Sequence, residues 1–275
     1  MKKLNFGCGN RISSGWINVD FHSSTPGVIS ANFINGLPFP TETFDVVYSS
    51  HVLEHFTENQ GRFLLKEAFR ILKNGGIIRI AVPDLEGTVK EYLRILSLEN
   101  ENSFKTKFYD WIILELLDQL VRTKNPSKMQ SFIDNIIDGG DETMMNYIRS
   151  RAESKLTMLS KANKSNNSDL LFRIRHLTFS KLKVRLTYYY LILIGKMIPS
   201  SIKPMVFKEI SIGEQHQWMY DRYSLDRLFK EIGFKNVRCM NFNESSIQDF
   251  NADHLDMNPD GSSYKNNTLY VEGVK

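Results

Sequence analysis

The chain has 275 residues, of which 41% are hydrophobic and 24% charged, so it is long enough for one good-sized globular domain with insertions and is not wholly disordered. Two cysteines, Cys8 and Cys239, exclude a disulfide framework and a cysteine metal cluster and favour a reducing cytoplasm. The net charge is +4, but residues 161–208 hold ten basic residues and one acid, a net +9 that leaves −5 for the rest, which excludes a general basic surface for duplex DNA.

Strand and helix patterns alternate over the first ninety residues and predict a parallel α/β sheet. The chain starts with Met1-Lys2-Lys3 and no apolar signal region, so we expect no secretion. A helix should begin after its cap at Thr57, run to about Leu72 and end at Gly75-Gly76. The predicted strands of this part are Lys3–Phe6, Trp16–Val19, Phe44–Ser49 and Ile77–Val82.

The pattern from about residue 85 to 160 is helical and amphipathic, with a stripe of Phe104, Phe108 and Trp111 that we expect in a core. A polar linker at 163–168 precedes a basic segment at 173–208, whose apolar run of about ten residues is too short to span a membrane, which takes about 20. The sheet pattern then returns with a helix at 223–232, closed by Gly233, and two strands, Val237–Phe242 and Thr268–Val274, at an antiparallel hairpin edge. The prediction is a sheet domain formed by residues 1–90 and 210–275, interrupted by a helical, basic insertion at 91–209.

The most informative motif is a glycine turn between the first two predicted strands. Leu4–Asn10 reads as a strand followed by a Gly7-Cys8-Gly9 turn, and Trp16–Asp20 reads as a strand that ends on an acid. This order is typical of a nucleotide-type site at the carboxyl edge of a parallel sheet. Ile12 occupies the third glycine position of a dinucleotide fingerprint, and Asp20 comes too early for one. A ligand with an adenosine but no phosphate therefore fits better than a pyrophosphate.

Several blocks in this order resemble the class I S-adenosylmethionine (SAM)-dependent methyltransferases of the type 11 group. Besides the glycine turn, they are Phe-Asp-Val-Val-Tyr-Ser-Ser-His-Val-Leu-Glu-His-Phe at 44–56 and Arg-Ile-Leu-Lys-Asn-Gly-Gly at 70–76. The later segment Gln215–Asp221, with Glu231-Ile232-Gly233-Phe234, is similar to a bacterial subgroup associated with surface-polysaccharide synthesis. The resemblance covers about half of the chain, at both ends. It implies a Rossmann-like, mostly parallel sheet and SAM as cofactor.

The resemblance also implies which residues hold the cofactor. Phe6, Gly7, Cys8 and Gly9 would wrap the methionine moiety, and Asp20 would bind both ribose hydroxyls. Asn32 stands where family members contact the adenine, while Ser49, Ser50 and His51 would lie beside the sulfonium. The family usually has an acid two residues before the first glycine, where this chain has Asn5, whose amide can still hydrogen-bond the amino group of SAM.

Residues absent from this chain narrow the acceptor. Ser49-Ser50-His51-Val52 stands where amino-methylating DNA enzymes carry Asn/Asp-Pro-Pro-Tyr, and neither cysteine is placed for cytosine-C5 chemistry. No close set of acids indicates a metal, so we expect none. The sequence therefore favours a small-molecule or glycan acceptor, without nucleic acid. Histidine suits a general base near neutral pH, and the candidates are His216, then His51, while Asp84 could bind acceptor hydroxyls.

The leading prediction is transfer of a methyl group to a hydroxyl in surface-glycan assembly. Methylation of a lipid or quinone-like acceptor is an alternative, and so is a non-catalytic binding module with the same fold. The segment 173–208 has three interpretations: a lid over the acceptor, a peripheral contact at the inner face of the membrane, or a site for an anionic nucleotide- or lipid-linked sugar. Trp218, Tyr220 and Tyr223 could form a wall on which a sugar stacks.

Overall fold

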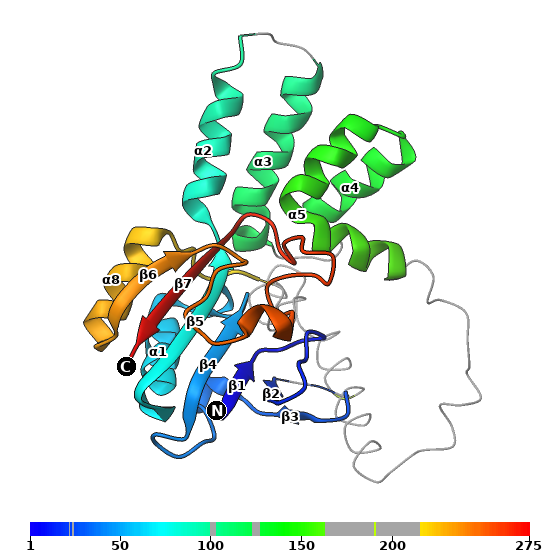
Figure 1. The fold of residues 1–275 in the computed structure, drawn as a ribbon. Coiled ribbons are helices and arrows are strands. Elements are labelled where there is room, and N and C mark those ends of the chain that lie inside the picture. The colour runs from blue at the N-terminus through cyan, green and yellow to red at the C-terminus, as the bar shows by residue number, and fades with distance from the viewer. Residues whose placement is uncertain (22, 24, 100–102, 123–126, 163–189, 191–214) are drawn as a thin grey trace, which may run out of the picture.

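A computed structural model gives the fold and describes the chain except for residues 22, 24, 100–102, 123–126, 163–189 and 191–214. The predicted polar linker and nearly all of the basic segment lie outside the described residues. Seven strands form one sheet in the order β3-β2-β1-β4-β5-β7-β6 (Figure 1). The strands are β1 Lys3–Phe6, β2 Trp16–Asp20, β3 Val28–Ser30, β4 Phe44–Ser50, β5 Leu72–Pro83, β6 Lys235–Met240 and β7 Thr268–Val274.

The first five strands of the chain are parallel, and β7 runs antiparallel to both of its neighbours, β5 and β6. This confirms the predicted α/β class with its antiparallel edge, the arrangement of Rossmann-like methyltransferases. The predicted strands coincide with β1, β2, β4 and β7 to within a residue. The short strand β3, which the sequence analysis did not predict, extends the parallel edge beyond β2.

The helix α1, Glu58–Ile71, begins as predicted with Thr57, which exchanges hydrogen bonds with Gln60 in a capping box. It ends at Ile71, within a residue of the predicted Leu72, because Leu72 already has extended dihedrals and pairs with Phe44 of β4, so β5 begins before the glycine pair. The helix α8, Arg222–Ile232, ends as predicted at Gly233, whose φ of +116° favours glycine.

Two apolar clusters cover the two faces of the sheet. On one face α1 and α8 pack through residues such as Leu64, Leu65 and Phe229. On the other face lies a smaller cluster around Trp16, Tyr48 and the short helix η3, Phe250–Asp253. The buried side chain of Arg79 lies here on β5 and ties the segment from β6 to β7 to the sheet.

Four helices project from the sheet at the end of β5 (Figure 1). They are α2 Leu85–Leu96, α3 Ser103–Val121, α4 Lys128–Asp138 and α5 Glu142–Ala162, in line with the helical pattern of the insertion. Trp111, Met129, Ile133 and Met144 form their own core. Trp111 is fully buried there as predicted, whereas Phe104 at the other end of the stripe is 44% exposed.

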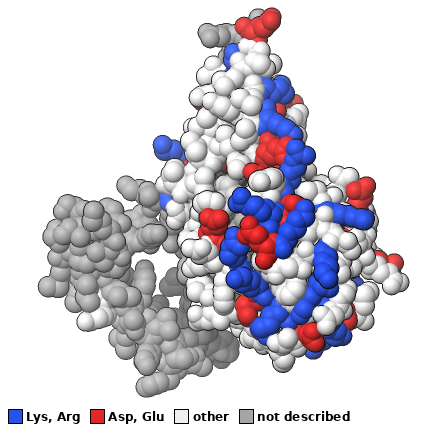
Figure 2. All heavy atoms as spheres, turned by 90° about the vertical axis from the view of Figure 1, so that its left-hand side faces the viewer, with Lys and Arg blue, Asp and Glu red and all other residues white. Residues whose placement is uncertain are grey.

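Charge on the described surface is mixed in sign. Figure 2 shows the face to which α8 belongs, where Lys and Arg side chains are interspersed with Asp and Glu. Ion pairs account for much of this mixture: Lys90 and Arg222 both meet Glu86, and Lys230 meets Asp226. Among the described helices, none is long and apolar enough to cross a membrane.

Candidate functional site

A cavity of about 530 Å³ opens where the carboxyl ends of β1, β2 and β4 meet. Parallel strands present their loops at this edge, which is where α/β sheets bind ligands. Its walls come from the glycine turn, from the 3-10 helix η2 (Leu53–His55), from α3 and α5 of the insertion, and from segments 216–219 and 264–267. The cavity therefore brings together parts of the chain from both ends and from the middle.

The glycine turn after β1 forms one wall of the cavity. The amides of Gly7 and Cys8 both donate to the carbonyl of Val19 on β2, at 2.8 and 3.2 Å. Gly7 has a φ of +69°, and a Cβ there would overlap Val52, so a side chain is excluded on both counts. Gly9 has a φ of +51° and open space where a Cβ would stand. The turn can therefore receive a ligand directly against its backbone.

Asp20 lies at the end of β2 on the same wall. One carboxylate oxygen accepts the Gly9 amide at 2.6 Å, and the other accepts the Phe21 amide at 2.7 Å. A carboxylate has about four acceptor positions, so these two bonds orient Asp20 and leave capacity for a pair of hydroxyls. This geometry suits the ribose role predicted for Asp20.

Two further predicted residues, Asn5 and Cys8, line the same wall. The Asn5 amide is 1% exposed and donates to the Arg11 carbonyl and to the Asn18 side chain, at 2.9 and 3.0 Å, so it holds the turn against β2. Burial, with a smaller effect of Asp20, raises the pKa of Cys8 to about 11. Its thiol therefore stays protonated at neutral pH, and an ionised nucleophile is not expected there.

Four predicted residues are not among the described residues that line the cavity: Phe6, Asn32, Ser49 and Asp84. Phe6 is buried below the turn and packs edge-on against Phe33, which does line it. Asn32 is exposed and caps the 3-10 helix η1, Phe33–Asn35, by accepting the Ile34 amide. Ser49 is buried in β4. Asp84 precedes α2, between the lining residues Pro83 and Thr88.

His51 stands at the end of β4 and lines the cavity, as does its neighbour Ser50. Its φ of +56° is uncommon for a residue with a side chain, and such backbone strain clusters at functional sites. Its Nδ1 lies 3.4 Å from Oε1 of Glu54, and its Nε2 lies 3.0 Å from the hydroxyl of Thr268. Glu54 is 1% exposed, so a buried carboxylate stands directly beside this imidazole.

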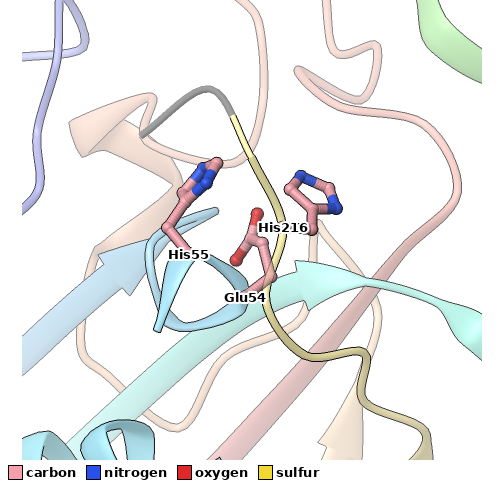
Figure 3. Close-up of side chains that lie close together, drawn as sticks. All are labelled: Glu54, His55 and His216. Carbon is pink, nitrogen blue, oxygen red and sulfur yellow. The ribbon is translucent and has the colours of Figure 1, made fainter. Parts of the chain in front are cut away.

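His216 lines the cavity from the segment that leads into α8, and its side chain is buried. Its ring meets the ring of His55 at 5.0 Å between centroids, in an edge-on arrangement. Figure 3 shows both imidazoles beside the carboxylate of Glu54. The structure therefore brings the two predicted bases, His51 and His216, to one region around the buried acid Glu54.

The insertion adds a polar wall that sequence reasoning missed. Arg151 of α5 donates two hydrogen bonds of 2.8 Å to Glu115 of α3. Asn267 donates to the same Glu115 at 2.8 Å and to Thr88 of α2 at 2.7 Å. All four line the cavity. No local spacing signals this set, because its members lie on three helices and the approach to β7.

The expected aromatic wall does not gather in one place. Tyr220 is 2% exposed and belongs to the sheet core, whereas Tyr223 is 72% exposed on α8 and Trp218 is 41% exposed. None of the three is among the described residues that line the cavity. Met219, which lies between Trp218 and Tyr220 in the sequence, does line it.

Comparison with known proteins places a methyltransferase signature on this part of the chain. Residues 4–80, which include the glycine turn, Asp20 and His51, match the family model described as a methyltransferase domain. Comparison with curated proteins gives no match.

The solved structures that resemble the chain are distant. A SAM-dependent methyltransferase from Archaeoglobus fulgidus is 10% identical, covers 100% of this chain and 86% of its own, and has a TM-score of 0.38. A SAM-dependent methyltransferase from Thermotoga maritima is 12% identical over 100% and 82%, with a TM-score of 0.35. The YcgJ protein from Bacillus subtilis is 18% identical, and the match spans 34% of this chain and about half (51%) of that one, with a TM-score of 0.25. Residues 4–80 thus match a methyltransferase domain, and S-adenosyl-L-methionine is the cofactor that such a domain implies.

Proposed function

We propose that the protein transfers a methyl group from SAM to a hydroxyl of a small-molecule or glycan acceptor, in the synthesis of cell-surface polysaccharide. The observation that carries the proposal is the cavity, which joins the glycine turn and Asp20 at one wall to His51 and a polar wall at another. When bound, SAM supplies a methyl group that its sulfonium already activates. The chain's own residues then have to bind SAM and the acceptor, align them, and receive the proton that the acceptor hydroxyl loses.

The residues of the first wall fit SAM. The open backbone at Gly9 offers a place for the methionine moiety, and the oriented carboxylate of Asp20 can accept from both ribose hydroxyls. Phe33, rather than Asn32, is the residue of that region that reaches the cavity, so we assign it the contact with the adenine ring.

We propose His51 as the general base, ahead of His216. A carboxylate beside Nδ1 holds an imidazole with its proton on that nitrogen, which leaves Nε2 to accept. Nε2 of His51 lies 3.0 Å from the hydroxyl of Thr268, whose own proton goes to the Asn266 carbonyl at 3.2 Å, so an acceptor hydroxyl has to replace Thr268 at this nitrogen before it can give up its proton there.

The polar wall supports an acceptor rich in hydroxyls. Glu115, Arg151 and Asn267 present carboxylate, guanidinium and amide groups to the cavity, and these are the groups that bind sugar hydroxyls. A lipid or quinone-like acceptor and a non-catalytic role stay as alternatives. A peripheral membrane contact, or a nucleotide- or lipid-linked sugar, would involve the segment 173–208, which lies outside the described residues.

Two measurements test the proposal. Calorimetric titration with SAM should give saturable binding that Asp20→Asn weakens at least tenfold, while the surface variant Asp226→Asn binds as the wild type does. Incubation with methyl-labelled SAM and a panel of nucleotide sugars, followed by mass spectrometry, should then give a methylated product. His51→Gln should lower turnover by about 10²- to 10⁴-fold with the affinity for SAM unchanged. An absence of SAM binding at millimolar ligand would refute an enzymatic role, and full turnover in His51→Gln would remove His51 as the base.

A further inference from the structure

Glu54, His55 and His216 form a compact group of potential metal ligands. One oxygen of Glu54 and one ring nitrogen from each histidine all lie within 4.8 Å of one another. Two of the residues come from η2 and the third from the segment before α8, and Figure 3 shows the carboxylate close to both rings. All three line the cavity. Two imidazoles and a carboxylate are a common protein ligand set for zinc and related divalent metals.

Backbone hydrogen bonds fix the two segments against each other. The amides of Gln217 and Trp218 both donate to the Glu54 carbonyl, at 2.7 and 3.2 Å. The Gln217 side chain donates to the carbonyl of His55 at 2.9 Å, and the His216 amide donates to Gln119 of α3 at 3.0 Å. The main chain therefore holds the three ligand residues together without help from a metal, which lowers the cost of ordering them on binding.

The hydrogen bond of His55 sets its ring for coordination. Nδ1 of His55 lies 3.0 Å from the carbonyl oxygen of Gln215, and a carbonyl can only accept, so Nδ1 carries the proton. The lone pair of a neutral ring is then on Nε2. Imidazoles that bind metals characteristically donate their other N–H to a carbonyl or carboxylate in this way.

The charge and burial of Glu54 also suit a cation. Its side chain is 1% exposed, and a carboxylate oxygen is a ligand that zinc and related divalent metals accept. A carboxylate has two oxygens, so one can face His51, as Oε1 does, while the other binds a metal. A metal ion here would therefore stand next to the proposed base and not displace it.

We infer that Glu54, His55 and His216 bind one divalent transition-metal ion, with zinc as the best fit to the ligand set. Three protein ligands leave a coordination position open toward the cavity, which is the arrangement of catalytic rather than structural zinc. The role of this open position rests on the proposed function. It would take the hydroxyl oxygen of the acceptor, because a bound metal ion lowers the pKa of that hydroxyl. The inference departs from the sequence-based expectation of no metal.

The test uses the full-length protein stripped with a chelator and titrated with Zn²⁺ or Co²⁺ alone, followed by calorimetry and, for Co²⁺, by visible absorption. The wild type should bind one ion per chain. His216→Ala and His55→Ala should each weaken binding by about 100-fold or more, since loss of even an outer partner costs 10- to 100-fold. His254→Asn, which changes an exposed histidine outside the cavity, should bind as the wild type does.

Two controls separate the loss of a ligand from a failure to fold. One is His216→Asn, which keeps a polar side chain, and the other is thermal unfolding of every variant without metal. A variant that unfolds like the wild type and binds Zn²⁺ equally tightly would overturn the inference, as would a wild type that binds no ion. SAM titration of the metal-free protein separates the two proposals. SAM binding without metal binding keeps the methyltransferase proposal and refutes the metal site. Metal binding without SAM binding keeps the metal site and refutes the methyltransferase proposal.

Discussion

Replacement of Arg79 by methionine should destabilise the protein severely, although Arg79 contacts no ligand. The guanidinium is fully buried and lies 2.7 Å from an oxygen of Asp256 and 2.7 Å from an oxygen of Glu272, each of which is 3% exposed. It also donates to the carbonyls of Asn241 and Glu244, at 3.0 and 2.8 Å. Burial alone would lower the pKa of Arg79, but the two carboxylates raise it above its ordinary value, so the side chain stays charged.

The magnitude follows from what the substitution leaves behind. Arg79→Met keeps most of the side-chain volume but strands two buried carboxylates, and breaking a buried ion pair costs about 3–5 kcal/mol. The matched control is Arg62→Met, which breaks a pair of nearly equal length, 2.6 Å to Glu231, with side chains that are 33% and 43% exposed. Exposed pairs contribute about 0–1 kcal/mol. Burial rather than distance therefore decides the difference between the two variants.

Urea unfolding followed by tryptophan fluorescence gives the free energies of unfolding. Arg79→Met should lose at least about 3 kcal/mol relative to Arg62→Met. Adding Asp256→Asn and Glu272→Gln to Arg79→Met should recover part of the loss, because no uncompensated charge then remains buried. A loss in Arg79→Met no larger than that of the control, or no recovery in the triple variant, would refute the reasoning.

Three further outcomes are expected. Gly7→Ala should cost about 2–3 kcal/mol in urea unfolding, because Gly7 has a positive φ and the new Cβ overlaps Val52. Adding Val52→Ala should restore the part of this loss that comes from the overlap. An equal loss with Val52 and with Ala at position 52 would contradict this reasoning. Hydrogen bonds from Arg70, then from the Leu37 amide, hold the pKa of Glu67 below its ordinary 4.5 against the effect of burial, so Glu67→Gln should cost about 1–2 kcal/mol at pH 7. Since a lowered folded-state pKa stabilises above the unfolded value, this difference should shrink as the pH falls below about 4.5, and a constant difference would exclude the charge as its origin. Asp20→Asn should weaken SAM binding in calorimetry, and because Asn keeps only one acceptor oxygen for the Gly9 and Phe21 amides, it should also cost about 1 kcal/mol in urea unfolding; unchanged SAM affinity would assign Asp20 to the turn's stability alone.

Local signals predicted the elements that local physics determines. The Thr57 cap starts α1 where the sequence placed it, and Gly233 ends α8, because each signal acts within one turn of helix. The helix ends within a residue of the predicted Leu72, but the sequence did not indicate that Leu72 itself pairs with Phe44, a contact across the sheet that periodicity along the chain does not report. The strand β3 has only three residues, too few for a pattern.

The candidate site also consists of a part that depends on local sequence and a part that depends on long-range contacts. The glycine turn and Asp20 are close in sequence, and their meeting in one wall could be predicted from the motif. Glu54 and His216 come from distant segments, and what brings them together is that the amides of Gln217 and Trp218 donate to the Glu54 carbonyl in η2. The sequence predicted His216 as a base from the polar and aromatic residues of its own segment, 215–221, and local sequence does not report the acid and the second ring that lie beside it.

The strand β7 lies between β5 and β6 in the sheet, and this position affects the order in which the chain folds. Ile77 pairs with Val274, so the whole insertion lies within the loop that this ladder closes. The entropy cost of closing a loop grows with its length, and long-range pairings slow folding. We therefore expect β1, β2 and β4 to assemble with α1 before β7 docks. Thr268, at the start of β7, reaches His51 only at that step, so in refolding the cavity should be among the last parts of the molecule to be completed.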